Sequence, residues 1–312
     1  MSKALKLAGK LDALESARGV VLTVGVFDGV HLGHRHLLRM VIERAEQVGA
    51  VSAVVTFEPH PQAVLSPGSE PPLLTTVEER VCLIREVGID VVGVLRFTTK
   101  VSLMSAEQYV DVLLDYFPLI EVWLGPGSAF GRGRQGTPEV LSEIGRRKGF
   151  SVRVVSPKLD DSVIISSTEI RRLLFHGNVE ESARLLGRAF SLSGEVVSGF
   201  ERGRELGFPT ANVATPPELL VPANGIYAVR VRVGGEQLHG VVNIGTRPTF
   251  EDGAGRTIEV HILDFGGNLY GQRICLEFIE RLRDEITFPN VQGLVEQIRH
   301  DVDQARRVLQ RL

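Results

Sequence analysis

The sequence has little cysteine, no long apolar run and no large excess of charge of either sign. Its two cysteines, Cys82 and Cys275, lie far apart, so they provide neither a disulfide framework nor the ligand spacing of a metal site. We expect both to be small buried apolar side chains. Such sparse use of cysteine is typical of a reducing compartment, and we expect a cytoplasmic protein.

The apolar segments are all too short to cross a bilayer. Residues 1–19, MSKALKLAGKLDALESARG, mix charged and apolar residues and lack the apolar run of a secretory signal. The net charge of −3 shows no basic surplus of the kind that favours nucleic acid. We therefore expect neither a membrane nor a nucleic-acid partner, and the sequence leaves the oligomeric state open.

In the first part of the chain, β-rich runs alternate with segments of helical period. The runs are residues 20–27, 51–57, 89–97, 121–125 and 151–157, and the helical segments are 36–49, 75–88, 105–117 and 137–149. In one of these helices, Thr76 and Glu79 predict a capping box and Gly88 predicts the end. The alternation predicts a doubly wound, Rossmann-like α/β domain, a parallel sheet with helices on both faces. Ligands bind such sheets beyond the carboxyl ends of the strands.

The helical period nearly disappears after residue 188. Two short helices precede that point within residues 166–187, and one amphipathic helix closes the chain at 290–312. Between them lie β-like runs separated by glycine-rich turns, at residues 190–199, 225–233, 237–245, 257–265 and 273–282. This spacing predicts a small antiparallel β-barrel or sandwich. The chain of 312 residues is therefore expected to form two domains, 1–186 and 187–312.

Three histidines gather within residues 24–38, VGVFDGVHLGHRHLL, between the first predicted strand and the first helix. Glycines let the backbone approach a ligand closely, and the N–H groups at the helix start favour an anion. His31 and His34 are three residues apart, so one helical turn places them on one face. The pattern favours a phosphate site. A zinc pair is less favoured, because Asp28 is the only nearby carboxylate and zinc normally takes three protein ligands.

The stretch ISSTEIRRLL, residues 165–174, begins the next candidate helix. Ser167 and Thr168 can cap this helix and expose its N–H groups, and Arg171 can reach a phosphate. By itself the stretch is equally an ordinary N-cap. Its place after the fifth predicted strand favours a contribution to the phosphate site.

The stretch GRELGFPTANV, residues 203–213, is the most distinctive motif of the second half. Gly203 and Gly207 permit a tight backbone around an anion. Thr210 and Asn212 are two apart, so their side chains share a face in an extended segment. A hydroxyl and an amide oxygen suit Mg²⁺ that also binds water and nucleotide phosphates. The alternative is a plain turn without a ligand.

These motifs together resemble those of bacterial bifunctional riboflavin kinase/FAD synthetases. In the first half the resemblance rests on GVFDGVHLGH, on TFEPHP (56–61) and on ISSTEIRRLL. In the second half it rests on GFPTAN, NIGTRPTF (243–250), IEVHILDF (258–265), LYG (269–271) and RLRDEITF (281–288). HxGH alone is shared with other nucleotidyltransferases, so the specificity comes from the ordered series.

The resemblance implies that riboflavin is phosphorylated by ATP to FMN, and that FMN then takes an adenylyl group from ATP to give FAD and pyrophosphate. It implies Glu259 as the catalytic base of the kinase, His31 and His34 as the catalytic residues of adenylyl transfer, and Mg²⁺ on Thr210 and Asn212. The flavin-binding residues it implies are Asn243, Thr249, Arg283 and Phe288. The nucleotide- and phosphate-binding residues it implies are Gly25, Phe27, Asp28, Gly29, Gly33, Ser167, Thr168, Arg171, Gly203 and Gly207.

One stretch departs from the family pattern. After the fourth predicted strand the family usually carries GxDFxFGxxxxG, with an acid or amide in the third position, whereas residues 125–136 are GPGSAFGRGRQG. Gly127 and Ser128 stand at the acid or amide position and at the aromatic position. Arg132 or Arg134 is a candidate to compensate.

Three alternative hypotheses follow. The first is a riboflavin kinase whose N-terminal domain is impaired or altered. The second is a flavin- or nucleotide-binding regulator without turnover, which would not need a base such as Glu259. The third is a different HxGH transferase fused to a barrel, which leaves GFPTAN unexplained.

Overall fold

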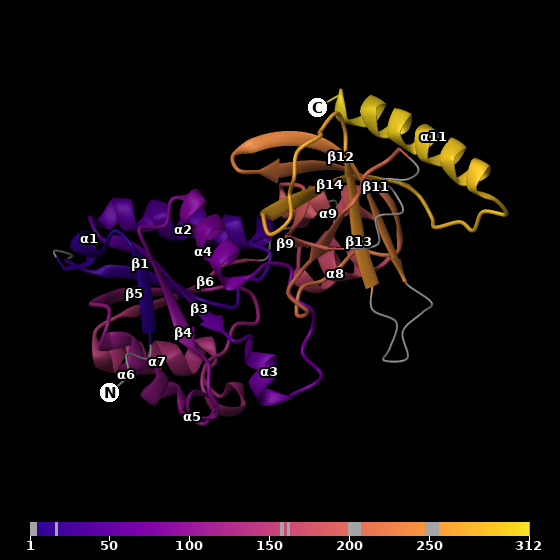
Figure 1. Cartoon of the computed structure of the whole chain (residues 1–312). Coiled ribbons are helices and arrows are strands. Elements are labelled where there is room, and N and C mark those ends of the chain that lie inside the picture. Colours follow the sequence, from indigo (N-terminus) through magenta and orange to yellow (C-terminus); the bar gives the residue numbers. More distant parts are fainter. Residues whose placement is uncertain are drawn as a thin grey trace. The chain divides into compact units, whose positions relative to one another are not determined.

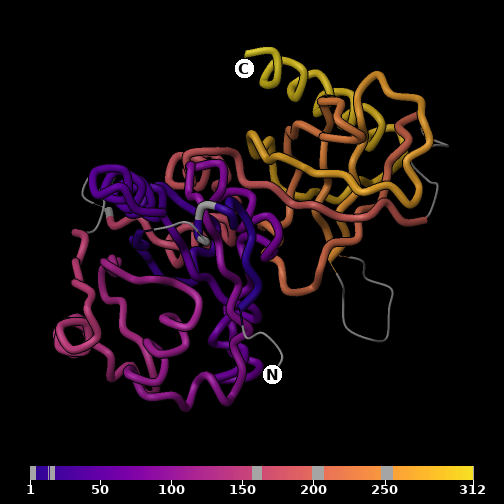
Figure 2. Tube along the Cα trace, turned by 90° about the vertical axis from the view of Figure 1, so that its left-hand side faces the viewer, coloured from indigo at the N-terminus to yellow at the C-terminus, as the bar shows by residue number. Residues whose placement is uncertain are grey.

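The structure is a computed structural model that describes residues 5–15, 18–156, 159–160, 163–198, 207–246 and 256–311. The chain forms two compact units, Met1–Ser167 and Thr168–Leu312. Helices α8 (Ser167–Phe175) and α9 (Val179–Leu186), which were predicted to end the first domain, thus belong almost entirely to the second unit. Figure 2 traces the chain from the indigo N-terminal unit to the orange and yellow C-terminal unit.

A six-stranded sheet forms the centre of the first unit, in the order β1-β4-β3-β2-β5-β6. The strands are β1 (Leu5–Gly9), β2 (Val20–Val24), β3 (Val51–Glu58), β4 (Val91–Arg96), β5 (Leu119–Leu124) and β6 (Ser151–Val154). Strands β2 to β6 are parallel, which confirms the predicted parallel sheet. Strand β1 was not predicted, and it pairs antiparallel with β4 at the edge.

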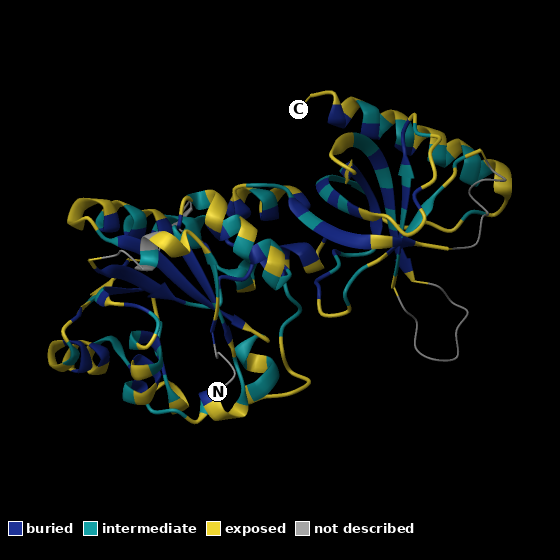
Figure 3. Cartoon of the chain, turned by 60° about the vertical axis from the view of Figure 1, so that its left-hand side comes forward, coloured by how far each residue is buried: buried dark blue, intermediate teal, exposed yellow. Residues whose placement is uncertain are grey.

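Helices cover both faces of this sheet (Figure 1). On one face α2 (Leu32–Val48) and α4 (Val77–Val87) pack on Val21, Val54 and Val92. On the other face α6 (Ala106–Leu114) and α7 (Pro138–Lys148) pack on the alternate strand residues, among them Leu22 and Val55. Figure 3 shows the strands as the buried layer between them. The central strands β2, β3 and β4 are buried along almost their whole length because both of their faces are covered.

Local signals fix the helix ends as the sequence predicts. Thr76 and Glu79 form both hydrogen bonds of a capping box at the start of α4, and Gly88 ends this helix in the left-handed conformation. The shorter helices are α1 (Leu11–Glu15), α3 (Pro61–Leu65), α5 (Thr99–Ser102) and the 3₁₀ turn at Arg132–Arg134.

The strand order reverses between β2 and β5. From β2 the chain moves outward to β3 and β4, and it later returns to add β5 on the other side of β2. The loops after β2 and β5 therefore diverge at the carboxyl ends of two neighbouring strands. Such a switch point is where a doubly wound sheet binds its ligand, and the HxGH stretch follows β2 directly.

The second unit is a closed antiparallel barrel in the order β10-β13-β12-β11-β14-β9. Its strands are β9 (Phe190–Val197), β10 (Ala211–Ala214), β11 (Gly225–Val233), β12 (Glu236–Thr246), β13 (Arg256–Ile262) and β14 (Arg273–Arg283). Strand β10 was not predicted as a strand, and it closes the barrel between β9 and β13. The first unit also contains a small hairpin of β7 (Leu159–Asp160) and β8 (Val163–Ile164).

The terminal helix α11 (Val291–Leu309) packs on the outside of β11, β12 and β14, as Figure 1 shows. Its apolar contact is small and consists mainly of Ala305, Val308 and Leu309 against Ala228 and neighbouring side chains. A buried ion pair adds to this contact: Asp301 accepts hydrogen bonds from the Arg283 guanidinium at 2.7–3.1 Å. The helix is therefore attached to the end of β14 by charge as well as by packing.

The expectation of two buried cysteines was wrong. Cys82 is exposed and Cys275 is partly exposed. On α4 the buried positions are Arg80 and Ile84, so Cys82 lies on the solvent face. On β14 the alternation buries Ile274 and Leu276 in the barrel and turns Cys275 outward. No described helix is both long and apolar enough to span a membrane.

We predict that Asp301→Ala lowers the free energy of unfolding of the second unit by about 3 kcal/mol, because it leaves the Arg283 guanidinium without its buried partner. Calorimetry measures the transition of the barrel. Fluorescence of Trp123, the single tryptophan of the sequence, monitors the first unit and should not change. Exposed Asp303 on the same helix provides the control Asp303→Ala. An equal loss in both variants would contradict the prediction.

Candidate functional sites

The loop between β2 and α2 brings the two histidines of HxGH into contact. His31 is the N-cap of α2, and its Nδ1 accepts a hydrogen bond from the His34 N–H at 3.2 Å. The two imidazole rings stack with centroids 3.6 Å apart, and the edge of Phe27 meets His34 at 5.1 Å. The predicted placement of both histidines on one face of the first turn is confirmed.

This loop has an unusual backbone. Phe27 and Val30 adopt φ values of 54° and 41°, and Gly29 lies between them at 80°. Such conformations are strained for non-glycine residues and persist only where the surroundings hold them. At Gly33 a Cβ atom would lie 3.1 Å from the His31 ring and 3.2 Å from the Ile165 carbonyl oxygen. Glycine at position 33 thus allows His31 to lie directly against the start of α2.

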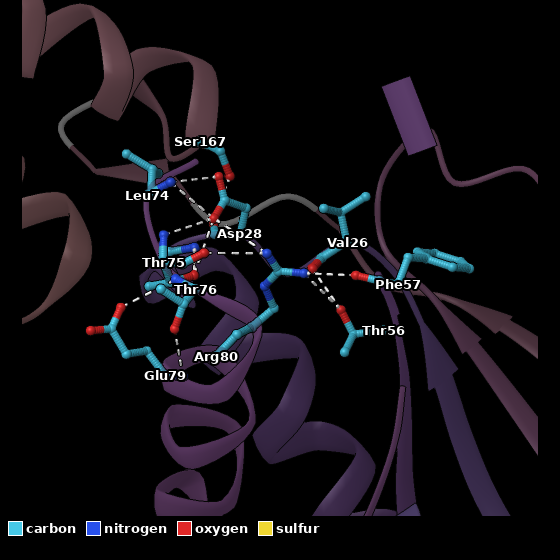
Figure 4. Close-up of polar contacts among 11 residues, drawn as sticks. Val26, Asp28, Thr56, Phe57, Leu74, Thr75, Thr76, Glu79, Arg80 and Ser167 are labelled. Carbon is cyan, nitrogen blue, oxygen red and sulfur yellow. Dashed lines mark hydrogen bonds and ion pairs between the residues drawn. The ribbon is translucent and has the colours of Figure 1, made fainter. Parts of the chain in front are cut away.

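Asp28 is buried, at 2% exposure, and its carboxylate is engaged within the protein. It accepts hydrogen bonds from the N–H groups of Leu74 and Thr75 at 2.9 and 3.1 Å, and from the Thr75 hydroxyl at 3.1 Å. The Arg80 guanidinium lies 3.8 Å away. Figure 4 shows this cluster. The sequence analysis did not predict that Leu74, Thr75 and Arg80 contact Asp28. The only nearby signal in the sequence was the capping box at the start of α4.

The ISST stretch meets the same loop through Ser167. The Ser167 hydroxyl donates to the carbonyl oxygen of Asp28 at 2.9 Å. The structure thus joins two stretches that are 139 residues apart in the sequence. Thr168 and Arg171 follow Ser167 on α8, and the Arg171 side chain is buried.

The environment of His34 favours its neutral form. Burial is the main cause that lowers the pKa of His34 well below its ordinary value, and electrostatic interactions with the His31 ring and with the Arg80 guanidinium lower this pKa further. The Nδ1 atom of His34 is buried and has no hydrogen-bond partner within the described part of the chain. A negatively charged group placed beside this ring would favour the protonated imidazole and so raise the pKa of His34.

The loop after β5 contains the departure from the family pattern. Gly127 has a φ of 66°, and a Cβ atom at this position would meet nothing within 4 Å in the described residues. The Arg134 guanidinium donates to the Gly127 carbonyl oxygen, and Phe130 pairs with Gly136 to close the loop. Arg134 therefore anchors the loop at Gly127, the position where the family pattern has an acid or an amide.

In the barrel, strand register brings together four of the predicted site residues. Asn212 pairs with Glu259, Glu259 with Asn243, Asn243 with Ile226, and Ile226 with Arg283. Residues paired across antiparallel strands point to the same face of a sheet. Since Ile258 and Val260 fill the barrel, this row lies on its outer face. Asn243 Oδ1 is buried there without a hydrogen-bond partner among the described residues.

A cavity of about 450 Å³ adjoins one end of this row. Thr210 and Asn212 line it together with the apolar residues Val196, Val260 and Ile262 and the segment 265–270. His261 Nδ1 lies 2.8 Å from the Pro209 carbonyl oxygen, which fixes the turn before Thr210. The hydroxyl and amide oxygens of Thr210 and Asn212 are hard donors that fit Mg²⁺, an ion commonly held by one or two protein oxygens and by substrate phosphates.

The predicted flavin-side residues Arg283 and Phe288 contact each other, with the guanidinium 6.0 Å from the ring centroid. The same guanidinium is held by Asp301, which sequence reasoning missed. Gly207 is exposed, with a φ of 84°. Gly203 and Thr249 lie outside the described residues. No three His, Cys, Asp or Glu side chains form a metal-binding group in the part of the chain that the structure describes.

Comparisons with known proteins match both units. A family model described as FAD synthetase matches residues 13–169, and one described as riboflavin kinase matches residues 186–309. The bifunctional riboflavin kinase/FMN adenylyltransferase of Listeria monocytogenes is 36% identical over 94% of this chain and 93% of its own. The enzyme of the same name from Pseudomonas fluorescens is 37% identical over 93% of each chain.

A solved structure has the same fold. The crystal structure titled macrolide-efflux protein, from Streptococcus pneumoniae, superposes with a TM-score of 0.84 at 29% identity and covers 93% of this chain and 94% of that one. One family model matches most of the first unit and the other matches most of the second, and the curated relatives match the chain over nearly its whole length. The chain therefore belongs to the bifunctional riboflavin kinase/FMN adenylyltransferase family.

Proposed function

We propose that each of the two activities belongs to one unit of the chain. The barrel phosphorylates riboflavin to FMN with ATP, and the α/β unit transfers an adenylyl group from a second ATP to FMN. The observation that supports this assignment best is the row of Asn212, Glu259 and Asn243 on three adjacent strands, beside the cavity that Thr210 lines. It joins a base, an amide acceptor and oxygen ligands on one face of one unit.

In the kinase reaction Glu259 accepts the proton of the riboflavin 5′-hydroxyl as its oxygen attacks the γ-phosphorus of ATP. The bond from the γ-phosphorus to the bridging oxygen breaks, and ADP leaves. Thr210 and Asn212 would hold Mg²⁺, which neutralises charge on the β- and γ-phosphates when bound. Asn243, Arg283, Phe288 and Thr249 are proposed on the flavin side, and Gly203 and Gly207 beside the phosphates.

In the adenylyl transfer a phosphate oxygen of FMN attacks the α-phosphorus of ATP, and pyrophosphate leaves. No protein nucleophile is needed, so catalysis consists of positioning and electrostatic stabilisation. His31 and His34 donate to phosphate oxygens at the N-terminus of α2, whose N–H groups and dipole favour the same charge. The loop residues Gly25, Phe27, Gly29 and Gly33 form the backbone of this site, with Asp28 behind them. Ser167, the last residue of the first unit, is proposed to complete it.

Several further expectations belong to the proposal. The Mg²⁺ requirement follows from the motifs, a cytoplasmic location from the sparse cysteines, and the boundary at residues 186–187 from the loss of helical period after residue 188. The hypothesis of an impaired N-terminal half is not favoured, because the FAD synthetase model matches residues 13–169 and the HxGH geometry is intact.

The experiment that tests the assignment incubates the full chain with riboflavin, ATP and Mg²⁺ and separates the flavins by chromatography. Both FMN and FAD are expected. Formation of FMN alone, with no FAD from supplied FMN, would restore the kinase-only hypothesis. Removal of Mg²⁺ by chelation with EDTA should stop both reactions.

We predict that Glu259→Gln lowers the rate of FMN formation by about 10²- to 10⁴-fold, because the amide cannot accept the hydroxyl proton. FAD formation from supplied FMN should remain at the wild-type rate. Glu195→Gln, at an exposed position of β9 in the same barrel, is the matched control. Loss of both activities in the folded Glu259→Gln variant would show that the two sites are not separate.

We predict the opposite pattern for His31→Ala. FAD formation from FMN should fall by at least about a hundredfold, because a donor to the transferring phosphates is lost, and riboflavin phosphorylation should continue. His36→Ala, on the same helix, is the control, and both rates should stay within about twofold of the wild type. Equal losses in the two variants would contradict a specific role of His31.

We predict that ATP binding to the first unit takes up a proton at His34. The pKa of His34 is lowered well below its ordinary value, mainly by burial, and phosphate charge beside the ring raises it. ATP affinity should therefore rise as the pH falls from about 7.5 to 6.5. Calorimetry in buffers of different ionisation enthalpy measures the uptake, with the Glu259→Gln background in use to exclude kinase turnover. His34→Gln should bind ATP with less proton uptake, and an unchanged uptake would contradict the prediction.

A further inference from the structure

Arg80 and Asp28 are the most deeply buried charged side chains near the HxGH loop. Arg80 is 2% exposed, on α4, and its ion-pair partner Asp28 is equally buried. Removing a charged pair from water is expensive unless hydrogen bonds satisfy both groups. None of the sequence motifs includes Arg80, and packing alone would be served by an apolar residue at this position of the helix. The presence of a guanidinium here therefore needs an explanation.

The Arg80 guanidinium connects three segments of the first unit (Figure 4). Nη1 donates to the Thr56 hydroxyl at 3.3 Å and to the Phe57 carbonyl at 3.2 Å, at the end of β3. Nη2 donates to the Thr75 carbonyl at 3.4 Å and lies 3.8 Å from the Asp28 carboxylate. Only a planar group with several donors can make these contacts at once.

Two of these partners, Thr56 and Thr75, in turn hold the HxGH loop. The Thr56 hydroxyl donates to the Val26 carbonyl at 2.8 Å. The Thr75 hydroxyl accepts from the Gly29 N–H at 3.2 Å and donates to Asp28. One cluster of hydrogen bonds around Thr56, Thr75 and Arg80 thus fixes residues 26, 28 and 29. These are the residues around the positive φ values of the loop, which need such support to persist.

Arg80 also acts on the histidines by its charge. Burial is the largest cause that lowers the pKa of His34, and the charged groups that lower it further are His31 and Arg80. Asp28, which is paired with Arg80, is the acidic group of the same cluster. Loss of the Arg80 charge should therefore let the pKa of His34 rise.

We propose that Arg80 is a positioning residue for adenylyl transfer: through Thr56, Thr75 and Asp28 it holds residues 26–29 in the strained conformation that places His31 and His34 against the phosphates. This inference rests on the proposed function of the first unit. Arg80 itself touches no substrate, because its guanidinium is enclosed by these partners.

The test compares Arg80→Met with Arg44→Met in the full chain. Arg44 is a matched control because it lies on α2 and pairs with another buried carboxylate, that of Glu121, at 2.7 Å and away from the loop. In Arg80→Met the kcat for FAD formation from FMN should fall by about ten- to a hundredfold, the size of effect expected when reacting groups are misplaced by about 1 Å. In Arg44→Met it should change by less than about threefold.

Two readouts distinguish positioning from a loss of fold. The kcat for riboflavin phosphorylation, measured on the same polypeptide, should remain unchanged in both variants. The His34 ring signal in a ¹H–¹³C NMR titration should show a higher pKa in Arg80→Met and the wild-type pKa in Arg44→Met. An unchanged His34 pKa, or equal losses of FAD formation in the two methionine variants, would overturn the inference.

Arg80→Lys keeps the inference testable if the methionine variant does not fold. Lysine retains the charge but not the planar fork, so the His34 pKa should stay low while the kcat for FAD formation falls by about tenfold. A wild-type kcat in Arg80→Lys would overturn the inference. If the wild-type chain makes no FAD, the proposed function of the first unit fails instead, and the two failures are thereby distinguished.

Discussion

The first unit depends on the burial of a charged pair, Asp28 and Arg80, at the carboxyl end of a parallel sheet. Hydrogen bonds stabilise these two buried charges: the carboxylate accepts from Leu74 and Thr75, and the guanidinium donates to Thr56 and Phe57. The same bonds fix a loop that would otherwise relax from its positive φ values. A site without a covalent nucleophile needs this rigidity, because geometry and preorganised charge are its main sources of catalysis.

In the barrel, strand register positions the candidate site residues. The pairing of β10, β13 and β12 places Asn212, Glu259 and Asn243 in one row without any contact among distant loops. Rigid hydrogen-bonded strands hold such a row more accurately than loops could. The ion pair between Arg283 and Asp301 extends this order to the terminal helix, which is attached by charge as well as by packing.

Much of the fold and of the two candidate sites could be predicted where the sequence pattern depends on residues close together in the chain. The helical stripe of α4 with its Thr76–Glu79 capping box, the five parallel strands and the alternation around Glu259 follow from neighbouring residues. Strand β1 was missed because an edge position tolerates a charged, weakly patterned segment, and β10 because four residues give too short an alternation. Arg80, Leu74 and Asp301 were missed because their roles depend on partners far away in the sequence. Cys82 was placed wrongly because a cysteine has no strong preference of its own on a helix.

The open sheet of the first unit ends differently on its two sides. At one edge β1 pairs antiparallel with β4, whereas at the other edge the parallel strand β6 has four mostly exposed residues, among them Arg153. A short edge with a charged side chain is a poor template for strand addition by another molecule. The barrel, being closed, offers no edge of this kind. Both edge strands of the open six-stranded sheet are therefore short and carry a basic side chain, Lys6 or Arg153, which limits sheet-to-sheet aggregation.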